Sequence, residues 1–268
     1  MHVHRITFSA SPATDYEVVA RAADEFLNAL RMNGQVLGRE WTLYIEGDDL
    51  AAIVKTPEHD SLGGRFYGDF VRAALERVRG QGIEVGVAAL GDRLHDVPAC
   101  ACTQRSGLVM YTHFPGAQSP LSCLDCFEAV PLYRMPLVDG DYHRLLSWQS
   151  DWQNCDRLQM DARTLERAAT REIADLRSAL CVEGRACADE LAGLTGIPVY
   201  YHLHRGNGRT LRSERARRCP GCDCEWLLPE PLHARFDFRC DACRLLSNVA
   251  GNVDRPVAPS TDAKDAEG

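Results

Sequence analysis

Two pairs of cysteines close to the end of the sequence have the spacing of a metal site. Cys219 and Cys222 form one C-x-x-C pair, and Cys240 and Cys243 form another, with seventeen residues between the pairs. Four thiolates can surround a Zn²⁺ ion tetrahedrally, and such a site is structural because no coordination position stays open for a substrate. The alternative is four buried thiols without a metal. The spacing predicts a zinc ribbon with one bound Zn²⁺.

A second group of four cysteines has a less diagnostic spacing. Cys100 and Cys102 form a C-x-C pair, and Cys123 and Cys126 follow as a C-x-x-C pair after twenty intervening residues. The group could bind a second Zn²⁺, with a nearby histidine in place of one thiolate, or it could be a set of buried thiols. The two histidines near these cysteines are His95 and His113.

The other four of the twelve cysteines have no partner at ligand spacing. Cys155, Cys181 and Cys187 fall on expected helices and are predicted to pack in the core, whereas Cys224 is predicted to be a spare thiol beside the ribbon. The opening residues show no basic segment followed by an apolar stretch, so we expect no secretion signal and a cytoplasmic protein. Cysteines stay reduced in the cytoplasm, which favours metal ligands and buried thiols over disulfides.

Basic residues gather next to the predicted ribbon in an otherwise acidic chain. The net charge is −8, with 19 basic and 28 acidic residues in positions 1–204, but nine arginines against six acidic residues in positions 205–244. A basic run beside a zinc ribbon predicts contacts with the phosphates of a nucleic acid, and the alternative is a solvated rim or ion pairs with the acidic remainder of the chain. The arginines of the predicted contact are Arg205, Arg209, Arg212, Arg215, Arg217 and Arg218.

Aromatic side chains near these arginines could stack on bases. In the expected strand that precedes them, period-two alternation places Tyr200, His202 and His204 on one face. Such a face beside arginines could stack the unpaired bases of RNA or DNA. Trp226 and Phe236 in the ribbon are further candidates, although a small core over the zinc is the favoured interpretation for both.

Other function classes find less support in the sequence. It has no H-E-x-x-H, G-x-S-x-G or G-x-x-x-x-G-K-[ST] motif, so no enzyme activity is predicted. A membrane span would need a run of about 18 apolar residues, and none exists. The alternative to nucleic-acid binding is a protein-binding module of the inhibitor, immunity or adaptor type, which would use the acidic first 204 residues to hold a basic protein partner.

The elements that must position these residues begin with alternating strand and helix patterns. Apolar runs and alternation indicate strands at 3–9, 41–45, 50–54 and 83–89, and apolar residues at helical spacing indicate helices at 13–32 and 66–78. This β-α-β-β-α-β order predicts a ferredoxin-like sandwich, with two helices on one face of an antiparallel sheet. Because that fold supports many functions, it does not by itself decide this one.

The remainder of the chain is predicted to be a Cys-rich segment, helices and the ribbon. Helices are expected at 141–160 and 161–194, and the poor helix propensity of glycine predicts a break near Glu183 and Gly184. Strands are expected at 199–204, 225–228 and 235–238. The sequence thus predicts an α+β protein with a ferredoxin-like domain at 1–92, a Cys-rich and helical segment at 93–198, a zinc ribbon with its basic flank at 199–249, and a disordered tail at 250–268.

Several stretches of the chain carry a further signal when they are taken together. They are Cys123-Leu-Asp-Cys126-Phe, Trp148-Gln149-Ser150, Pro198-Val-Tyr-Tyr201, Arg218-Cys-Pro-Gly-Cys222 and Phe236-Asp-Phe-Arg-Cys-Asp-Ala-Cys243. Together they resemble a family of bacterial zinc-ribbon proteins of unknown function. The resemblance spans roughly residues 95–250, and its C-terminal block is the most specific part. It implies a bacterial protein, a ribbon whose ligands are the last two cysteine pairs, and nucleic-acid binding. Cys224 departs from the small residue expected at that position.

Overall fold

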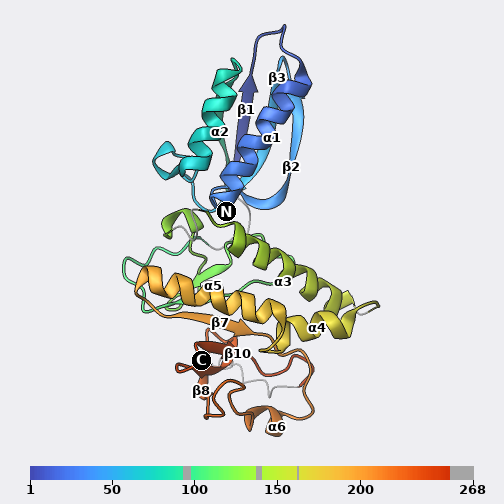
Figure 1. Cartoon of the computed structure of the whole chain (residues 1–268), viewed down its shortest axis with the longest axis vertical. Helices are drawn as coiled ribbons and strands as arrows, with labels where there is room; N and C mark the ends of the chain where they lie inside the picture. Colours follow the sequence, from blue (N-terminus) through green and yellow to red (C-terminus); the bar gives the residue numbers. More distant parts are fainter. Residues whose placement is uncertain (93–97, 137–140, 162, 254–268) are drawn as a thin grey trace, which may run out of the picture. The chain divides into compact units, whose positions relative to one another are not determined.

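The computed structural model of the chain describes residues 1–92, 98–136, 141–161 and 163–253. The chain divides into two compact units, Met1–His202 and Leu203–Gly268. Both units contain helices and strands, so the protein is of the α+β class (Figure 1). His95 and the greater part of the tail predicted to be disordered lie outside the described residues.

The first unit begins with six elements in the order β1, α1, β2, β3, α2, β4, which is the β-α-β-β-α-β order predicted from the sequence. All strand pairs of their sheet are antiparallel, and the strands lie in the order β2-β3-β1-β4. The bounds are His2–Ser9 for β1, Tyr16–Met32 for α1, Leu37–Glu46 for β2, Asp49–Thr56 for β3, Asp69–Gly80 for α2 and Glu84–Asp92 for β4.

Burial periodicity explains these elements. In β1, Ile6 and Phe8 are buried while the residues between and after them are only half-buried, as period-two alternation requires. Phe26 of α1 packs edge-to-face against Phe8, with ring centroids 6.4 Å apart. The side chain of Asp15 caps α1 by accepting a hydrogen bond from the backbone amide of Glu17 at 3.0 Å. A continuous apolar core therefore forms between the helices and the sheet.

The middle of the first unit combines short strands with three helices. Its strand β5 pairs with β6 antiparallel and with β7 in parallel. In Figure 1, α5 runs alongside α3, and α4 joins the two helices. The bounds are Leu108–Met110 for β5, Leu121–Cys123 for β6, His143–Asp161 for α3, Glu166–Ala174 for α4, Ala179–Thr195 for α5 and Val199–Leu203 for β7.

The predicted helix break near Glu183 and Gly184 is wrong, because the chain breaks earlier, between α4 and α5. Gly184 lies inside α5, where a Cβ atom would come within 2.4 Å of both Trp148 Nε1 and Tyr201 Cε2. Glycine is used here for close packing of α5 against its neighbours, and this packing compensates for its poor helix propensity.

Tyr133 connects the middle of the first unit to its N-terminal sheet. It belongs to a 3₁₀ turn, Leu132–Arg134. The Tyr133 hydroxyl donates to Glu58 Oε2 at 2.6 Å and lies 2.8 Å from Ser61 Oγ. Arg134 also pairs with the Glu58 carboxylate, at 2.5 Å. Burial and the contact with Glu58 raise the pKa of Tyr133 above its ordinary value, so the hydroxyl remains a donor.

The second unit is a small antiparallel sheet preceded by a short helix. Strand β9 pairs with β8 on one side and with β10 on the other. The bounds are Leu211–Arg215 for α6, Leu227–Leu232 for β8, Phe236–Cys240 for β9 and Leu245–Ser247 for β10. The strands predicted at 225–228 and 235–238 overlap β8 and β9, whereas β10 was not expected.

None of the helices in the described part of the chain has both the length and the apolar character that a membrane span requires.

Candidate metal centres

The last two cysteine pairs come together in the second unit. The sulfur atoms of Cys219, Cys222, Cys240 and Cys243 all lie within 4.8 Å of one another. The Sγ atoms of Cys222 and Cys240 are 3.6 Å apart. A regular tetrahedron with Zn–S bonds of about 2.3 Å would place its sulfurs about 3.8 Å apart, so the four thiols have the dimensions of a metal site.

Local backbone geometry brings the sulfurs of this cluster together. In the first pair the backbone amide of Asp223 donates to the carbonyl of Cys219 at 2.9 Å, which closes a tight turn. In the second pair the amide of Cys243 points at the sulfur of Cys240, at 3.4 Å. The residue that follows each pair, Asp223 or Arg244, has a left-handed backbone with φ of 59° and 52°. Each C-x-x-C pair therefore forms a compact knuckle that turns both sulfurs to one side.

The middle cysteines form a further cluster, here named the first cluster because it lies in the first unit, and the last two pairs form the second cluster, in the second unit. The sulfurs of Cys100, Cys102, Cys123 and Cys126 also lie within 4.8 Å of one another. Phe127, directly after the C-x-x-C pair, has a φ of 62° and so repeats the left-handed geometry of the other two knuckles. The structure therefore brings together all eight cysteines of the two predicted sites, in two groups that could each hold a metal ion.

Strand pairing and one arginine position the middle cluster. Cys123 ends β6, and the amide of Cys100 donates to the carbonyl of Ala129 at 2.9 Å. The amide of Asp125 points at the sulfur of Cys123, at 3.4 Å. Arg105 Nε donates to the sulfur of Cys100 at 3.4 Å. Burial would raise the pKa of Cys100, but this hydrogen bond and those of the neighbouring cysteines bring the pKa below its ordinary value.

The thiols of each cluster affect one another's ionisation. Burial raises the pKa of Cys123 and Cys126 in the first cluster, and it raises the pKa of Cys240 to about 11 in the second. The pKa of Cys222 is lowered to about 6, first by a hydrogen bond from the backbone of Cys224. Four thiolates this close repel one another, and a divalent cation between them removes that repulsion and deprotonates the thiols.

The remaining cysteines stay outside both clusters. Cys181 and Cys187 are buried, as predicted for core residues, and Cys155 is half-buried. Cys224 is exposed and is not among the clustered sulfurs, which agrees with its interpretation as a spare thiol. His113, which was considered as a replacement ligand, is also not part of either group.

The predicted stacking face of Tyr200 and His202 is not available at the surface, and this prediction is wrong. Tyr200 is 1% exposed and His202 is 6% exposed. The His202 ring packs against Tyr111 and Trp152, with centroids 5.1 and 6.2 Å away. Both residues lie on β7, and all five residues of this strand are buried. His204 is half-buried.

The predicted phosphate-binding arginines divide into two groups. Arg205 and Arg217 pair with the carboxylate of Glu214, at 2.8 and 3.0 Å, and Arg218 pairs with Glu225 at 3.0 Å. For these three, the alternative of ion pairs within the chain is the correct one. The exposed arginines of the run that take part in no ion pair with another described residue are Arg209, Arg212 and Arg215.

Trp226 and Phe236 are buried in the second unit, which confirms the interpretation of both as core residues. The Trp226 ring packs on Phe238 with centroids 5.1 Å apart, and the Arg217 guanidinium lies 4.3 Å from the centre of the Phe238 ring. These contacts form the small apolar core next to the second cysteine cluster.

Two residues of these sites were not predicted from the sequence. Arg105 lies between the two pairs of the first cluster, and its spacing from Cys100 indicates no contact. Glu214 is the single acidic residue within the arginine run. A lone carboxylate among arginines is the one sequence signal that could have indicated that Glu214 pairs with several of them.

Comparison with solved structures finds likenesses over about a third of the chain. Rv0793 from Mycobacterium tuberculosis is 16% identical, with a TM-score of 0.27, and the match covers 35% of this chain and 99% of that one. SnoaB, a cofactor-independent oxygenase from Streptomyces nogalater, is 21% identical with a TM-score of 0.22, covering 35% of this chain and 94% of that one.

Family models match three segments of the chain. Residues 1–89 match a model described as Domain of unknown function (DUF8589), residues 102–204 match Domain of unknown function (DUF2310), and residues 208–253 match Domain of unknown function (DUF8594). The second and third models each contain most or all of one cysteine cluster.

Relatives of this chain occur in Haemophilus influenzae. One, described as an uncharacterized protein, is 35% identical over 245 residues, which is 88% of this chain and 93% of the relative. Another with the same description is 37% identical over 171 residues, covering 62% of this chain and 83% of the relative. The chain therefore belongs to the same bacterial protein family as these two Haemophilus influenzae proteins.

Proposed function

We propose that the protein binds two Zn²⁺ ions, one in each four-cysteine cluster. The observation that carries this proposal is the convergence of four sulfurs to within 4.8 Å in each unit. Thiolates in a tetrahedral arrangement suit zinc or iron, and the three compact C-x-x-C knuckles are typical of zinc sites. We further propose that the sheet formed by β1–β4 is ferredoxin-like and that the second unit is a zinc ribbon.

The role of both ions is structural. Four thiolate ligands occupy all positions of a tetrahedral ion, so neither site has room for a substrate or an activated water. The second unit has a small apolar core, and small domains of this kind commonly need a metal to fold. Because the ligands must be reduced, we propose a reducing compartment such as the cytoplasm.

The metal content of the purified protein tests this proposal. Inductively coupled plasma mass spectrometry should find two Zn per chain, with Cys240→Ser and Cys123→Ser each losing about one. The matched controls are Cys224→Ser and Cys155→Ser, which should both retain two. If the protein contained iron, which would also show visible absorption from iron–thiolate bonds, the metal identity proposed here would be wrong. A chain without bound metal would refute the whole proposal.

We also propose that the second unit binds nucleic acid through its exposed arginines. Arg212 and Arg215 lie on α6, and Arg209 precedes it. All three arginine side chains are exposed, in a chain whose net charge is −8. Arginines that are not already paired can bind phosphates without first breaking an ion pair, and this distinguishes them from Arg205, Arg217 and the other paired members of the run.

Salt dependence separates this proposal from a protein-binding function. Fluorescence anisotropy with a labelled single-stranded RNA should show affinity falling steeply between about 50 and 200 mM salt. In a plot of the logarithm of the association constant against the logarithm of the salt concentration, changing Arg209, Arg212 and Arg215 to Ala should make the slope shallower by about 2.

A triple variant of exposed arginines in the first unit serves as the matched control, since it removes the same charge. The residues to change to Ala are Arg21, Arg79 and Arg167. Equal losses in the two triple variants, or no retention of RNA at low salt, would refute nucleic-acid binding. Co-purification of one basic protein in equal amount would then favour the protein-binding module.

A further inference from the structure

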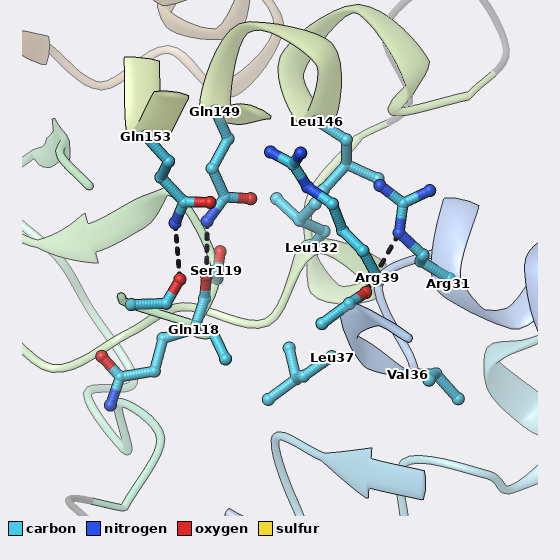
Figure 2. A pocket seen from close by; sticks show the side chains of 14 residues that line it. Arg31, Val36, Leu37, Arg39, Gln118, Ser119, Leu132, Leu146, Gln149 and Gln153 are labelled. Carbon is cyan, nitrogen blue, oxygen red and sulfur yellow. Dashed lines mark hydrogen bonds between the residues drawn. The ribbon is translucent and has the colours of Figure 1, made fainter. Parts of the chain in front are cut away.

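A small cavity, lined by apolar side chains such as Leu132 and Leu146 as well as by polar ones, lies in the first unit between the end of α1, the start of β2 and helix α3 (Figure 2). Arg31 and Arg39 line one side, and Gln149 and Gln153 line the other. The loop 116–119 completes the wall. No cysteine of either cluster lines this cavity, so it is separate from the candidate metal centres.

The two arginines bring unbalanced positive charge to this cavity. Arg31 is half-buried, and its Nε donates to the carbonyl of Gly38 at 3.1 Å. Within the described part of the chain, neither Arg31 nor Arg39 has a carboxylate within ion-pair distance. Burial and the charge of Arg39 lower the pKa of Arg31. In Figure 2 the two guanidinium groups lie on either side of Leu146.

The opposite wall is held in place by hydrogen bonds. The side-chain amide nitrogen of Gln149 donates to the carbonyl of Gln118 at 2.7 Å. The amide nitrogen of Gln153 donates to Thr112 Oγ1 at 3.0 Å and to the carbonyl of Gly116. Figure 2 shows these amide nitrogens directed to the loop, which leaves the amide oxygens on the side of the arginines. The oxygens can therefore accept hydrogen bonds from a ligand.

The size of the cavity limits what can enter. Its volume is about 50 Å³. One water-sized sphere needs about 10–15 Å³, so the space takes a group of roughly four heavy atoms. A phosphate or carboxylate group has this size, and the planar guanidinium of arginine binds both by paired hydrogen bonds.

We infer that this cavity binds an oxyanion, the phosphate or carboxylate group of a small molecule, between Arg31 and Arg39. The anion offsets the positive charge of the two arginines, and hydroxyl or amine groups of the same molecule donate to the oxygens of Gln149 and Gln153. The site uses residues of the N-terminal sheet region and of α3, so a bound ligand connects these two parts of the first unit.

Isothermal titration calorimetry of the full chain tests the inference. The probes are inorganic phosphate and acetate, each titrated in chloride buffer of matched ionic strength. At least one should bind at a single site, and Arg39→Gln should weaken it at least about tenfold because a charge-assisted contact is lost. Arg31→Gln should weaken it similarly. The matched control is Arg21→Gln, because Arg21 is an exposed arginine of α1, the helix that also carries Arg31. This variant should bind the probe with the affinity of the unaltered protein.

The two probes distinguish the possible ligands. Binding of phosphate alone assigns a phosphoryl group, binding of acetate alone assigns a carboxylate, and binding of both assigns a general oxyanion site. Arg31 also bonds to Gly38, so Arg39→Gln, which removes no such contact, is the deciding variant. No binding heat with either probe, or equal affinity in Arg39→Gln and Arg21→Gln, would overturn the inference.

Discussion

At the scale of single residues, the carboxylate of Glu214 organises the polar part of the second unit. Glu214 is 1% exposed. It accepts hydrogen bonds from Arg205 at 2.8 Å and from the backbone amide of Ala250 at 3.3 Å, and it forms an ion pair with Arg217 at 3.0 Å. Burial alone would raise the pKa of Glu214, but the Arg205 hydrogen bond and the two positive charges hold it below its ordinary value. The carboxylate is therefore charged at neutral pH.

Removing this charge should destabilise the protein. We expect Glu214→Gln to lower the free energy of unfolding by about 2–3 kcal/mol, because two arginines lose their buried partner. Urea denaturation measures the change. Glu225→Gln is the control, since Glu225 is exposed in its pair with Arg218, and it should change stability by less than about 0.5 kcal/mol. Similar effects of the two substitutions would contradict a central role for Glu214.

At the scale of elements, helix α5 depends on a glycine for its packing. Gly184 faces Trp148 of α3 and Tyr201 of β7, and the space between them is too small for a methyl group. Gly193 lies in the same helix, with nothing within 4 Å of the position that a Cβ would take. Two glycines of one helix thus differ in their surroundings and not in their intrinsic propensity.

The two glycines should respond oppositely to alanine. Gly184→Ala should lower the free energy of unfolding by about 1–3 kcal/mol, because the added methyl group forces Trp148 and Tyr201 apart. Gly193→Ala should raise it by about 0.5 kcal/mol, because alanine favours the helix and meets open space. Thermal or urea unfolding with tryptophan fluorescence measures both changes. If Gly184→Ala stabilised the protein, the space between α5, Trp148 and Tyr201 would be large enough for a methyl group, and this would contradict the close packing described for Gly184.

At the scale of the whole molecule, each of the two units contains one four-cysteine cluster. The ligands of a cluster all come from the same unit. A metal ion bound at one cluster therefore crosslinks only its own unit, and the two ions should stabilise separate parts of the chain.

Loss of one metal site should unfold one unit. In Cys240→Ser, trypsin should cleave quickly at the arginines between 205 and 244, whereas sites on α3 and α4 should stay protected. Cys123→Ser should reverse this pattern, because its cluster lies in the first unit. Limited proteolysis followed by mass spectrometry locates the cleavages. Equal sensitivity of both units in either variant would show that they fold as one.

Much of the candidate site could be predicted because its determinants are local. Two cysteines separated by two residues can turn their sulfurs to one side through a single tight turn, and all three C-x-x-C pairs do so with a left-handed residue directly after them. The β-α-β-β-α-β order is also readable, because strand and helix periods differ and each element buries one face.

Exposure could not be predicted in the same way, because it depends on elements far apart in the sequence. Tyr200 and His202 alternate as a strand requires, but both side chains are buried, and the His202 ring packs against Tyr111 and Trp152, which come from other segments. The cavity between Arg31, Arg39 and α3 has the same origin, since more than one hundred residues separate its two walls along the chain.

Spacing and periodicity act over a few residues, so they were enough to predict the two groups of four cysteines, the order of the N-terminal elements and the α+β class. Only the tertiary structure decided which arginines are paired with carboxylates, which aromatic residues are buried, and why Gly184 stands inside a helix. Each of these depends on packing between distant segments, where one side chain excludes another or a buried charge must find its partner.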